Sequence, residues 1–349
     1  MQAAIDVASS GDVLFVEAGP TIHVESFVIP GDLTIKAAVP GGCTTATTNP
    51  TERAKFQAEP GFATVAIRAL AAEVELVNLV LADGNGYRAG NIDAVDPDNL
   101  TLRIYNSVIA GGISPESGGG IRMDGGWLYL EDTTLINNEA MTFGGAISTA
   151  TAKVQLVGDT LITQSEGDYG GAISVYNGDV WMFGNARVVG AQAGQDGGCI
   201  YATNVIMKND SLVSDCESDR NGGAVRAFDK VHLFNNSVIE DGKAAENGGL
   251  IYASDVFLAG ESRLSNGLAY GNGGLVYLTK NTTNTLDVQA PFSAGLELIL
   301  EGGRAMDGGA VYAGADATVT LLNRVVVKDN QALGFGGGFF LSEATMTAT

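Results

Sequence analysis

The chain of 349 residues contains 48 glycines but only 8 prolines, and 45% of its residues are hydrophobic. This composition excludes a disordered glycine-rich linker, because such a linker lacks the apolar residues for a core. The formal net charge of −21 argues against nucleic acids and anionic membranes as partners, since both are bound through lysine and arginine. An acidic surface favours solubility, divalent cations or a salty medium.

The first 32 residues predict an N-terminal cap. Residues 5–16 are typical of a short helix that turns, at Gly11-Asp12, into an alternating apolar strand. A helix across the first coil of a repeat domain shields the open edge of that coil. We therefore assign residues 1–32 to the cap and the first strand, and residues 33–349 to the repetitive domain.

A pair of glycines followed by two mostly small or apolar residues recurs nine times between residues 118 and 339. Successive pairs begin 25 to 28 residues apart, except for one interval of 35 residues, which predicts an outward loop near Thr279–Thr285. A nearly constant period indicates a stacked repeat architecture. Repeated glycine indicates bends that need positive φ angles or the absence of Cβ atoms. The glycines assigned to this structural role are Gly144, Gly145, Gly170, Gly171, Gly197, Gly198, Gly222, Gly223, Gly248, Gly249, Gly273, Gly274, Gly308 and Gly309.

Each repeat also contains two short strands before its glycine pair. Val154–Leu156 and Val256–Leu258 are examples of the first strand, with apolar residues on both sides of an outward-facing one. A polar turn such as Gly158-Asp159 leads to a second apolar stretch, and a third strand follows the glycines. Three strands and three bends in about 26 residues make one coil of a parallel β-helix, and parallel crossovers favour the right-handed form.

Weaker copies of the first strand extend the pattern upstream, at residues 33–35, 74–76 and 102–104. The sequence therefore predicts an all-β chain, a right-handed parallel β-helix (solenoid) of about eleven coils with a short N-terminal capping helix. The C-terminal tail carries little apolar bulk. We therefore expect Phe339–Leu341 to lie against a neighbouring molecule rather than under residues 342–349, with the β-helix continuing or assembling beyond them.

The three cysteines, Cys43, Cys199 and Cys216, form no C-x-x-C motif and cannot all pair with one another. Cys199 takes the small-residue position of its repeat, where other copies have alanine, so we interpret it as a packing residue. Cys199 and Cys216 lie 17 residues apart, which is less than one period, and we expect them not to stack in adjacent coils. The cysteines alone leave the cellular compartment open.

An aromatic residue follows the apolar start of the third strand in five repeats, and arginine takes this position in a sixth. Because side chains alternate along a strand, this residue points away from the core. Such a row could hold sugar rings or a partner subunit, or it could form a ladder that stabilises only itself. The aromatic row consists of Tyr201, Tyr252, Tyr277, Tyr312 and Phe340, with Arg226 in the coil after Tyr201.

The Gly-Gly-Ala-Ile runs, with a preceding apolar-x-x-Asn as in Leu135–Asn138, resemble the repeats of polymorphic outer membrane proteins. Those repeats form passenger domains of surface autotransporters, and related repeats occur in extracellular proteins of other bacteria, algae and protists. The opening of the chain resembles the entry to the pectin-lyase-like β-helix superfamily. The repeat resemblance covers residues 100–341 and implies an extracellular or cell-surface location, although residues 1–5 do not read as a signal peptide.

β-Helix polysaccharide hydrolases resemble one another in an aspartate cluster with Gly-His-Gly and Arg-x-Lys motifs. Neither His23 nor His232 lies in such a motif, and His232 takes an outward strand position. A lyase would need an arginine or lysine base beside calcium-bound carboxylates. Asp93, Asp96 and Asp98 could supply oxygens to calcium or could belong to an ordinary solvated loop. We therefore assign no catalytic residue, no metal site and no cofactor, and leave only calcium open.

The sequence thus predicts a non-enzymatic extracellular β-helix that serves as a rigid stalk, a surface adhesin or a filament component. The partners we expect are further copies of the chain, bound head to tail, and a carbohydrate or a cell-surface protein. Nucleic acid binding and direct membrane insertion are not expected. The alternative is a polysaccharide-binding module or a calcium-assisted polysaccharide lyase.

Overall fold

The computed structural model of the chain describes residues 1–38, 53–68, 72–95, 99–279, 285–289, 297–322 and 324–348. Of the features named from the sequence, Cys43, Asp96, Asp98 and residues 280–284 of the expected loop lie outside these ranges. The structure is all-β, with 54% of its residues in strands and 1% in helix, and its parallel sheets form a β-solenoid of about eleven turns. The predicted fold class is therefore confirmed.

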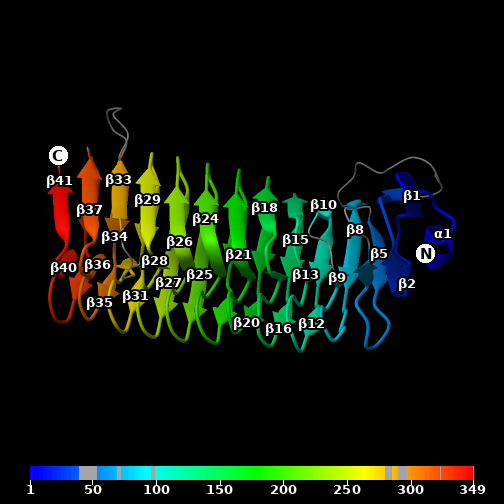
Figure 1. Cartoon of the computed structure of the whole chain (residues 1–349), viewed down its shortest axis with the longest axis horizontal. Helices are drawn as coiled ribbons and strands as arrows, with labels where there is room; N and C mark the ends of the chain where they lie inside the picture. The colour runs from blue at the N-terminus through cyan, green and yellow to red at the C-terminus, as the bar shows by residue number, and fades with distance from the viewer. Residues whose placement is uncertain are drawn as a thin grey trace. The chain divides into compact units, whose positions relative to one another are not determined.

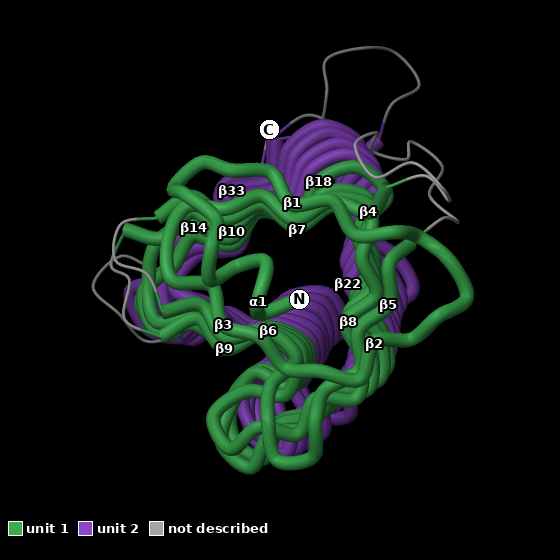
Figure 2. The backbone as a smooth tube through the Cα atoms, turned by 90° about the vertical axis from the view of Figure 1, so that its right-hand side faces the viewer, with its two compact units in different colours: residues 1–167, 172–178 green, residues 168–171, 179–349 purple. Residues whose placement is uncertain are grey.

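The chain divides into two compact units, which Figure 2 colours green and purple. Unit 1 comprises Met1–Gly167 and Ala172–Gly178, and unit 2 comprises Asp168–Gly171 and Asp179–Thr349. Within each unit the strands pair in parallel with their equivalents one repeat later in the sequence. The same coil is therefore the building block of both units.

One coil of unit 1 shows how the repeat folds. β14 (Trp127–Glu131) is the first strand, β15 (Thr134–Ile136) is the second, and β17 (Ile147–Thr149) is the third, after the glycine pair. Between the second and third strands lies a two-residue strand that was not predicted, β16 (Glu139–Ala140). It is separated from β15 by a corner at Asn137, whose φ of 53° is left-handed. Asparagine tolerates this conformation better than most residues, and the bend divides one side of the coil into two.

In unit 1 the strands stand in parallel rows, one row for each kind of strand in the coil (Figure 1). The first strands are β1 (Asp12–Glu17), β4 (Leu33–Ala38), β7 (Glu73–Val77), β10 (Thr101–Tyr105), β14 and β18 (Lys153–Val157). The second strands are β2 (Ile22–Val24), β5 (Ala54–Gln57), β8 (Leu79–Ala82), β11 (Val108–Ala110), β15 and β19 (Leu161–Thr163). The short strands are β12 (Ile113–Ser114), β16 and β20 (Glu166–Gly167). The third strands are β3 (Phe27–Ile29), β6 (Val65–Ile67), β9 (Ile92–Ala94), β13 (Ile121–Met123), β17 and the beginning of β21 (Ile173–Met182).

Unit 2 repeats this order, but some of its strands are continuous around a corner. A third strand runs into the next first strand in β24 (Ile200–Met207) and β26 (Val225–Leu233), and a second strand runs into the short one in β25 (Leu212–Ser218) and β27 (Val238–Ala244). The remaining first strands are β29 (Asp255–Ala259), β33 (Thr285–Gln289), β37 (Thr318–Leu322) and β41 (Thr345–Ala348). The remaining second and short strands are β22 (Arg187–Val189), β23 (Gln192–Ala193), β30 (Arg263–Ser265), β31 (Leu268–Ala269), β34 (Leu298–Glu301), β35 (Arg304–Ala305), β38 (Val325–Lys328) and β39 (Gln331–Ala332). The remaining third strands are β28 (Ile251–Ala253), β32 (Val276–Leu278), β36 (Val311–Ala313) and β40 (Phe339–Leu341).

The core of each unit consists of the inward residues of these strands, stacked coil on coil. In unit 1, Leu102 lies beside Leu128, and Leu128 lies beside Val154, in the register of the parallel ladder. All three side chains are fully buried. Burial of one such side chain stabilises the fold by about 1.5–3 kcal/mol, so a continuous apolar stack explains why these short strands hold together.

A short helix, α1 (Gln2–Ile5), lies across the opening of the first coil of unit 1 (Figure 2). Ile5 is buried, and the Gln2 side chain takes the place of a neighbouring strand along β3. The backbone N–H of Val28 donates to Gln2 Oε1 at 2.6 Å, and Gln2 Nε2 donates to the Val28 carbonyl at 3.2 Å. Together these contacts cover apolar residues and satisfy edge backbone groups, so the predicted capping helix is present.

The C-terminal tail does not fold back over β40. Its residues form β41, which pairs in parallel with β37, with Thr318 beside Thr345 and Leu321 beside Ala348. The tail is therefore the first strand of a further coil, and Phe339–Leu341 are half-buried. A contact of these residues with a neighbouring molecule stays a prediction.

The glycine pairs combine two physical requirements, which Gly222 and Gly223 illustrate. Gly222 has a φ of 68°, a left-handed angle that L-residues rarely adopt. At Gly223 a Cβ atom would fall on the carbonyl oxygen of Gly249 and 2.5 Å from the backbone nitrogen of Lys243. The first glycine thus supplies a conformation, and the second supplies space for the next coil. The same positive φ occurs at Gly118, Gly144, Gly170, Gly197, Gly248, Gly273, Gly308 and Gly336.

The interpretation of Cys199 as a packing residue alone was wrong, because Cys199 and Cys216 form a disulfide with their Cα atoms 5.5 Å apart. They do not occupy equivalent positions in the stack. Cys199 lies between β23 and β24. Cys216 lies in the part of β25 that pairs with β23, and β25 therefore belongs to the next coil. A separation shorter than one period rules out stacking at equivalent positions, but it allows this bond across the loop between adjacent coils.

We predict that Gly223→Ala destabilises the chain strongly, by about 2–4 kcal/mol, because the added methyl group meets backbone that cannot move aside. Gly338→Ala is the matched control, since its Cβ would meet only a Val327 methyl group at 3.8 Å. The control should stay within about 0.5 kcal/mol of the parent. Thermal unfolding followed by circular dichroism measures both variants, and equal melting temperatures for them would contradict the spatial role of the second glycine.

Candidate functional site

The predicted aromatic row lies on the outer side of the third strands of unit 2. The residues that precede its members are fully buried, as at Ile200, Ile251 and Val276, so the outward orientation is confirmed. In the ladder Tyr252 lies beside Tyr277, Tyr277 beside Tyr312, and Tyr312 beside Phe340. The repeat thus places four of the five predicted aromatic residues in one line.

These four rings form a continuous stack. The centroid distances are 5.0 Å from Tyr252 to Tyr277, 4.9 Å from Tyr277 to Tyr312, and 5.1 Å from Tyr312 to Phe340. The planes differ by 2°, 2° and 14° in the same order. The spacing matches the roughly 4.8 Å between neighbouring strands, so the backbone ladder itself sets the separation of the rings.

Tyr201 does not join this stack, because Arg226 occupies the intervening position. The Arg226 guanidinium lies 4.5 Å from the centre of the Tyr252 ring and 4.8 Å from that of Phe228. Tyr201 packs instead against Phe228 at 5.0 Å and Tyr169 at 5.3 Å, and only 9% of it is exposed. Burial lowers the pKa of Arg226 and raises the pKa of Tyr252. The predicted row therefore consists of two aromatic clusters, one around Tyr201 and one that begins at Tyr252, and the Arg226 guanidinium contacts the rings of both.

The stack leaves little ring surface for a ligand. Tyr277 is covered on one face by Tyr252 and on the other by Tyr312, so only its edge faces solvent. Burial and the two neighbouring tyrosines raise the pKa of Tyr277. Of the two interpretations of the row, the geometry favours a ladder that stabilises unit 2.

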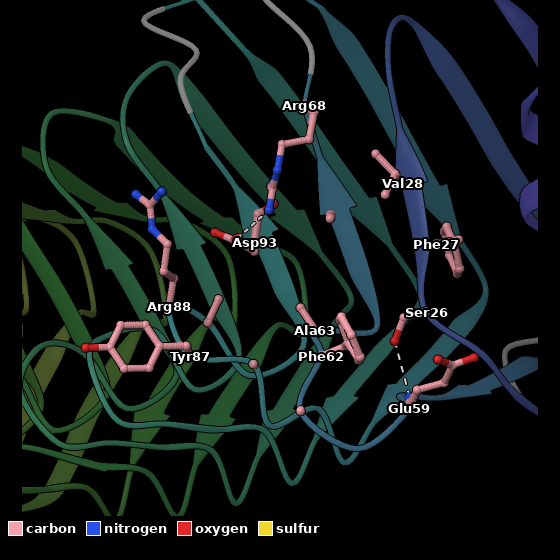
Figure 3. A pocket seen from close by; sticks show the side chains of 14 residues that line it. Ser26, Phe27, Val28, Glu59, Phe62, Ala63, Arg68, Tyr87, Arg88 and Asp93 are labelled. Carbon is pink, nitrogen blue, oxygen red and sulfur yellow. Dashed lines mark hydrogen bonds and ion pairs between the residues drawn. The ribbon is translucent and has the colours of Figure 1, made fainter.

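The corresponding row of unit 1 carries small and charged residues in place of aromatic ones. In ladder order, after Val28 in the first coil, it reads Ala66, Asp93, Arg122, Ser148 and Ser174. Beside it lies a cavity of about 390 Å³, whose lining includes Arg68, Arg88 and Tyr87 (Figure 3).

Arg68 is held in one orientation at this cavity. Its Nη1 donates to the backbone carbonyl of Asp93 at 2.7 Å and to that of Ile67 at 3.2 Å. Its Nη2 donates to Asp93 Oδ2 at 2.7 Å (Figure 3). A guanidinium offers five N–H groups, so three hydrogen bonds fix Arg68 and leave further donors for the cavity.

Charges alternate from Arg68 across the neighbouring coils. Asp93 Oδ1 lies 3.7 Å from Arg122 Nη1, and Arg122 Nη2 lies 2.9 Å from Asp124 Oδ1. Arg88 Nη2 lies 3.9 Å from Asp124 Oδ2. Three arginines and two aspartates thus form one network with an excess of one positive charge, in a chain whose net charge is −21. Opposite charges on adjacent strands also stabilise the ladder.

The calcium interpretation finds no support at Asp93, because its carboxylate is bound by Arg68 and faces Arg122. Within the described ranges, no group of three or more histidine, cysteine or acidic side chains could hold a metal ion. His232 lies on the outward side of its strand, as predicted, and its Nε2 is 3.2 Å from Asp255 Oδ2. His23 packs against Phe56, with ring centroids 5.3 Å apart.

Two aromatic side chains complete the cavity of unit 1. Phe62 is 57% exposed and Tyr87 is 69% exposed, and both lie on loops that lead into third strands. Figure 3 shows them along the loop side of the cavity, while Arg68 and Asp93 lie on the strand side. The cavity therefore combines exposed aromatic side chains with an arginine–aspartate pair, a combination typical of sites for small polar ligands.

The sequence pattern alone did not reveal this site. It singled out Asp93, but as one of three adjacent aspartates rather than as the partner of Arg68 and Arg122. Before their third strands, the coils upstream of residue 118 lack the glycine pair, so their register with later coils is not visible in the sequence. With that register, Asp93 falls at the position of the aromatic row, beside Arg122, which directly follows the first glycine motif and could have been placed in the row from the sequence.

Comparison of the chain with known proteins gives no significant match to a protein-family model, a curated protein or a solved structure. In the part of the chain that the structure describes, no helix is long and apolar enough to cross a membrane.

We predict that Tyr277→Ala destabilises unit 2 by about 1–3 kcal/mol, because it removes two stacked pairs, each worth about 0.5–1.5 kcal/mol. Tyr270→Ala is the control, since Tyr270 is 61% exposed and lies outside the stack. The control should change stability by less than about 0.5 kcal/mol. Chemical denaturation followed by tyrosine fluorescence compares the two, and a loss of similar size in both would refute the ladder role.

Proposed function

We propose that the chain is a non-enzymatic, extracellular β-solenoid that serves as a rigid structural or adhesive module, such as a stalk, a surface adhesin or a filament component. The observation that carries this proposal is the stacking of like side chains along unit 2, with Tyr252, Tyr277 and Tyr312 in parallel contact. With Phe340, this stack links four successive coils of unit 2 outside the core. It stiffens the surface of the unit without forming a reaction centre.

A second ladder supports the same proposal. Asn221 Nδ2 donates to Asp196 Oδ1 at 3.1 Å, and Asn247 Nδ2 donates to Asn221 Oδ1 at 3.1 Å. The backbone N–H of Asn272 then donates to Asn247 Oδ1 at 3.0 Å. These residues directly precede glycine pairs, so the loops of successive coils are tied together by side-chain amides. Unit 2 thus has cross-links along its loops as well as along its strands.

The disulfide between Cys199 and Cys216 supports an extracellular location. Structural disulfides persist in oxidising compartments and are rare where glutathione and thioredoxin keep thiols reduced. The resemblance of the repeats to those of surface proteins points in the same direction.

The test of the proposed function combines location with activity. On intact cells that produce the protein, we expect antibodies to label the chain before lysis. Purified chain incubated with calcium and pectate or alginate should produce no unsaturated uronate absorbance, because a lyase needs a positioned base that the proposal does not contain. Labelling only after lysis would contradict the extracellular role, and lyase activity abolished by one arginine or aspartate substitution would contradict the non-enzymatic role.

We predict that the Cys199→Ala/Cys216→Ala variant is less stable than the parent by about 3 kcal/mol, since the disulfide closes a loop of 17 residues. A reductant should lower the melting temperature of the parent to that of the variant and leave the variant unchanged. If the reductant destabilises both proteins equally, the bond does not contribute to stability.

A further inference from the structure

The cavity of unit 1 presents polar groups that are oriented before any ligand arrives. Arg68 is fixed by Asp93 and Ile67, and the carboxylates of Asp93 and Glu59 also line the cavity. Guanidinium groups only donate hydrogen bonds, and carboxylates only accept them. A ligand that satisfies both kinds of group must be able to donate and to accept, which is the property of a hydroxyl group.

The loop side of the cavity carries two exposed aromatic side chains. Phe62 and Tyr87 are more than half exposed, although burial of an aromatic side chain is favourable. In unit 2, by contrast, the tyrosines of the stack cover one another. A ligand with apolar C–H faces next to its hydroxyl groups would contact the aromatic side chains and the charged groups of the cavity at once.

Other ligand classes fit this cavity less well. The charged groups that line this cavity balance, with Arg68 and Arg88 against Asp93 and Glu59, so a carboxylate or phosphate gains no net attraction there. A peptide cannot add to the sheet here, because β6 is already paired with β3 on one side and with β9 on the other. The chemistry therefore selects an uncharged molecule with many hydroxyl groups.

A second hollow continues the same surface. It measures about 290 Å³, and its lining includes Arg122, Asp124, Ser148 and Tyr176. Like the first hollow, it combines an arginine–aspartate pair with an aromatic residue, since Tyr176 is 56% exposed. Asp93, Arg122 and Ser148 are neighbours in the ladder, so the two hollows lie within a few coils, at roughly 4.8 Å per coil. A linear ligand crossing the strands would meet both.

We propose that these two hollows bind a neutral, linear oligosaccharide, with sugar rings against Tyr87 and Tyr176 and hydroxyl groups on the arginine–aspartate network. The inference rests on the proposed adhesive function and names its ligand. Arg68, Asp93 and Arg122 supply the hydrogen bonds, and Phe62 and Tyr87 supply the apolar contact. The acidic remainder of the chain disfavours uronate polymers over neutral ones.

The test is isothermal titration of the whole chain with neutral hexasaccharides (cello-, manno-, xylo- and β-1,3-gluco-oligosaccharides) and with hexa-uronates from pectate and alginate. We expect at least one neutral hexasaccharide to bind, with an affinity that EDTA does not change, and the hexa-uronates to bind at least tenfold more weakly. The variant Phe62→Ala/Tyr87→Ala should lose at least tenfold in affinity. Tyr270→Ala, which removes a tyrosine of similar exposure from unit 2, should bind like the parent.

The dependence of affinity on the length of the oligosaccharide distinguishes binding to both hollows from binding to one hollow. Tyr176→Ala should weaken binding of the hexasaccharide but not of the corresponding disaccharide. Binding to no neutral hexasaccharide, preference for the uronates, or full affinity in Phe62→Ala/Tyr87→Ala with an unchanged melting temperature would each overturn the inference.

Antibody labelling of intact cells is independent of these titrations. A chain that is found at the cell surface but binds no sugar would therefore refute this inference and leave the proposed structural role intact.

Discussion

The parallel ladder between successive coils is the constraint on which the rest of the structure depends. Because neighbouring strands lie about 4.8 Å apart, each side chain lies directly beside its equivalent in the next coil. At Gly223 this proximity excludes even a Cβ atom, since the carbonyl of Gly249 fills the space. At Tyr277 the same proximity places two further rings at stacking distance. One spacing therefore decides which positions must be empty and which can support one another.

The same spacing gives the two units different outer surfaces. In unit 2, aromatic residues at equivalent positions stack and close their faces to solvent. In unit 1, the equivalent positions hold Asp93 and Arg122, which lie directly opposite each other in the ladder. Like charges at this distance would repel, so a charged row is stable only when its signs alternate. The alternation keeps oriented donors and acceptors at the surface, where the aromatic ladder offers only ring edges.

The coils could be predicted from the sequence because their signals repeat. Alternating apolar residues report burial in every coil, and from residue 118 onward the glycine pairs report the bend before each third strand. The strand Glu139–Ala140 was missed because two residues carry no periodicity of their own. The disulfide was missed because Cys199 and Cys216 meet across a loop rather than at equivalent positions. The arginine network was missed for a similar reason, since Arg68, Arg88 and Arg122 come from different parts of their coils and meet only in three dimensions.

The difference between features that recur from coil to coil and features that occur once also separates structural from ligand-binding aromatic residues in a repeat protein. A residue that recurs at one position, such as Tyr277, has its own copies as neighbours, so its apolar surface is already buried by the repeat. Phe62 and Tyr87 have no such copies, and their faces stay in water at a free-energy cost that the fold does not recover. Aromatic residues that have no copies in neighbouring coils, and that remain exposed beside fixed charges, are therefore the residues that we expect to contact a ligand. In this chain such residues belong to unit 1, whereas the row that the periodicity of the sequence makes most conspicuous belongs to unit 2.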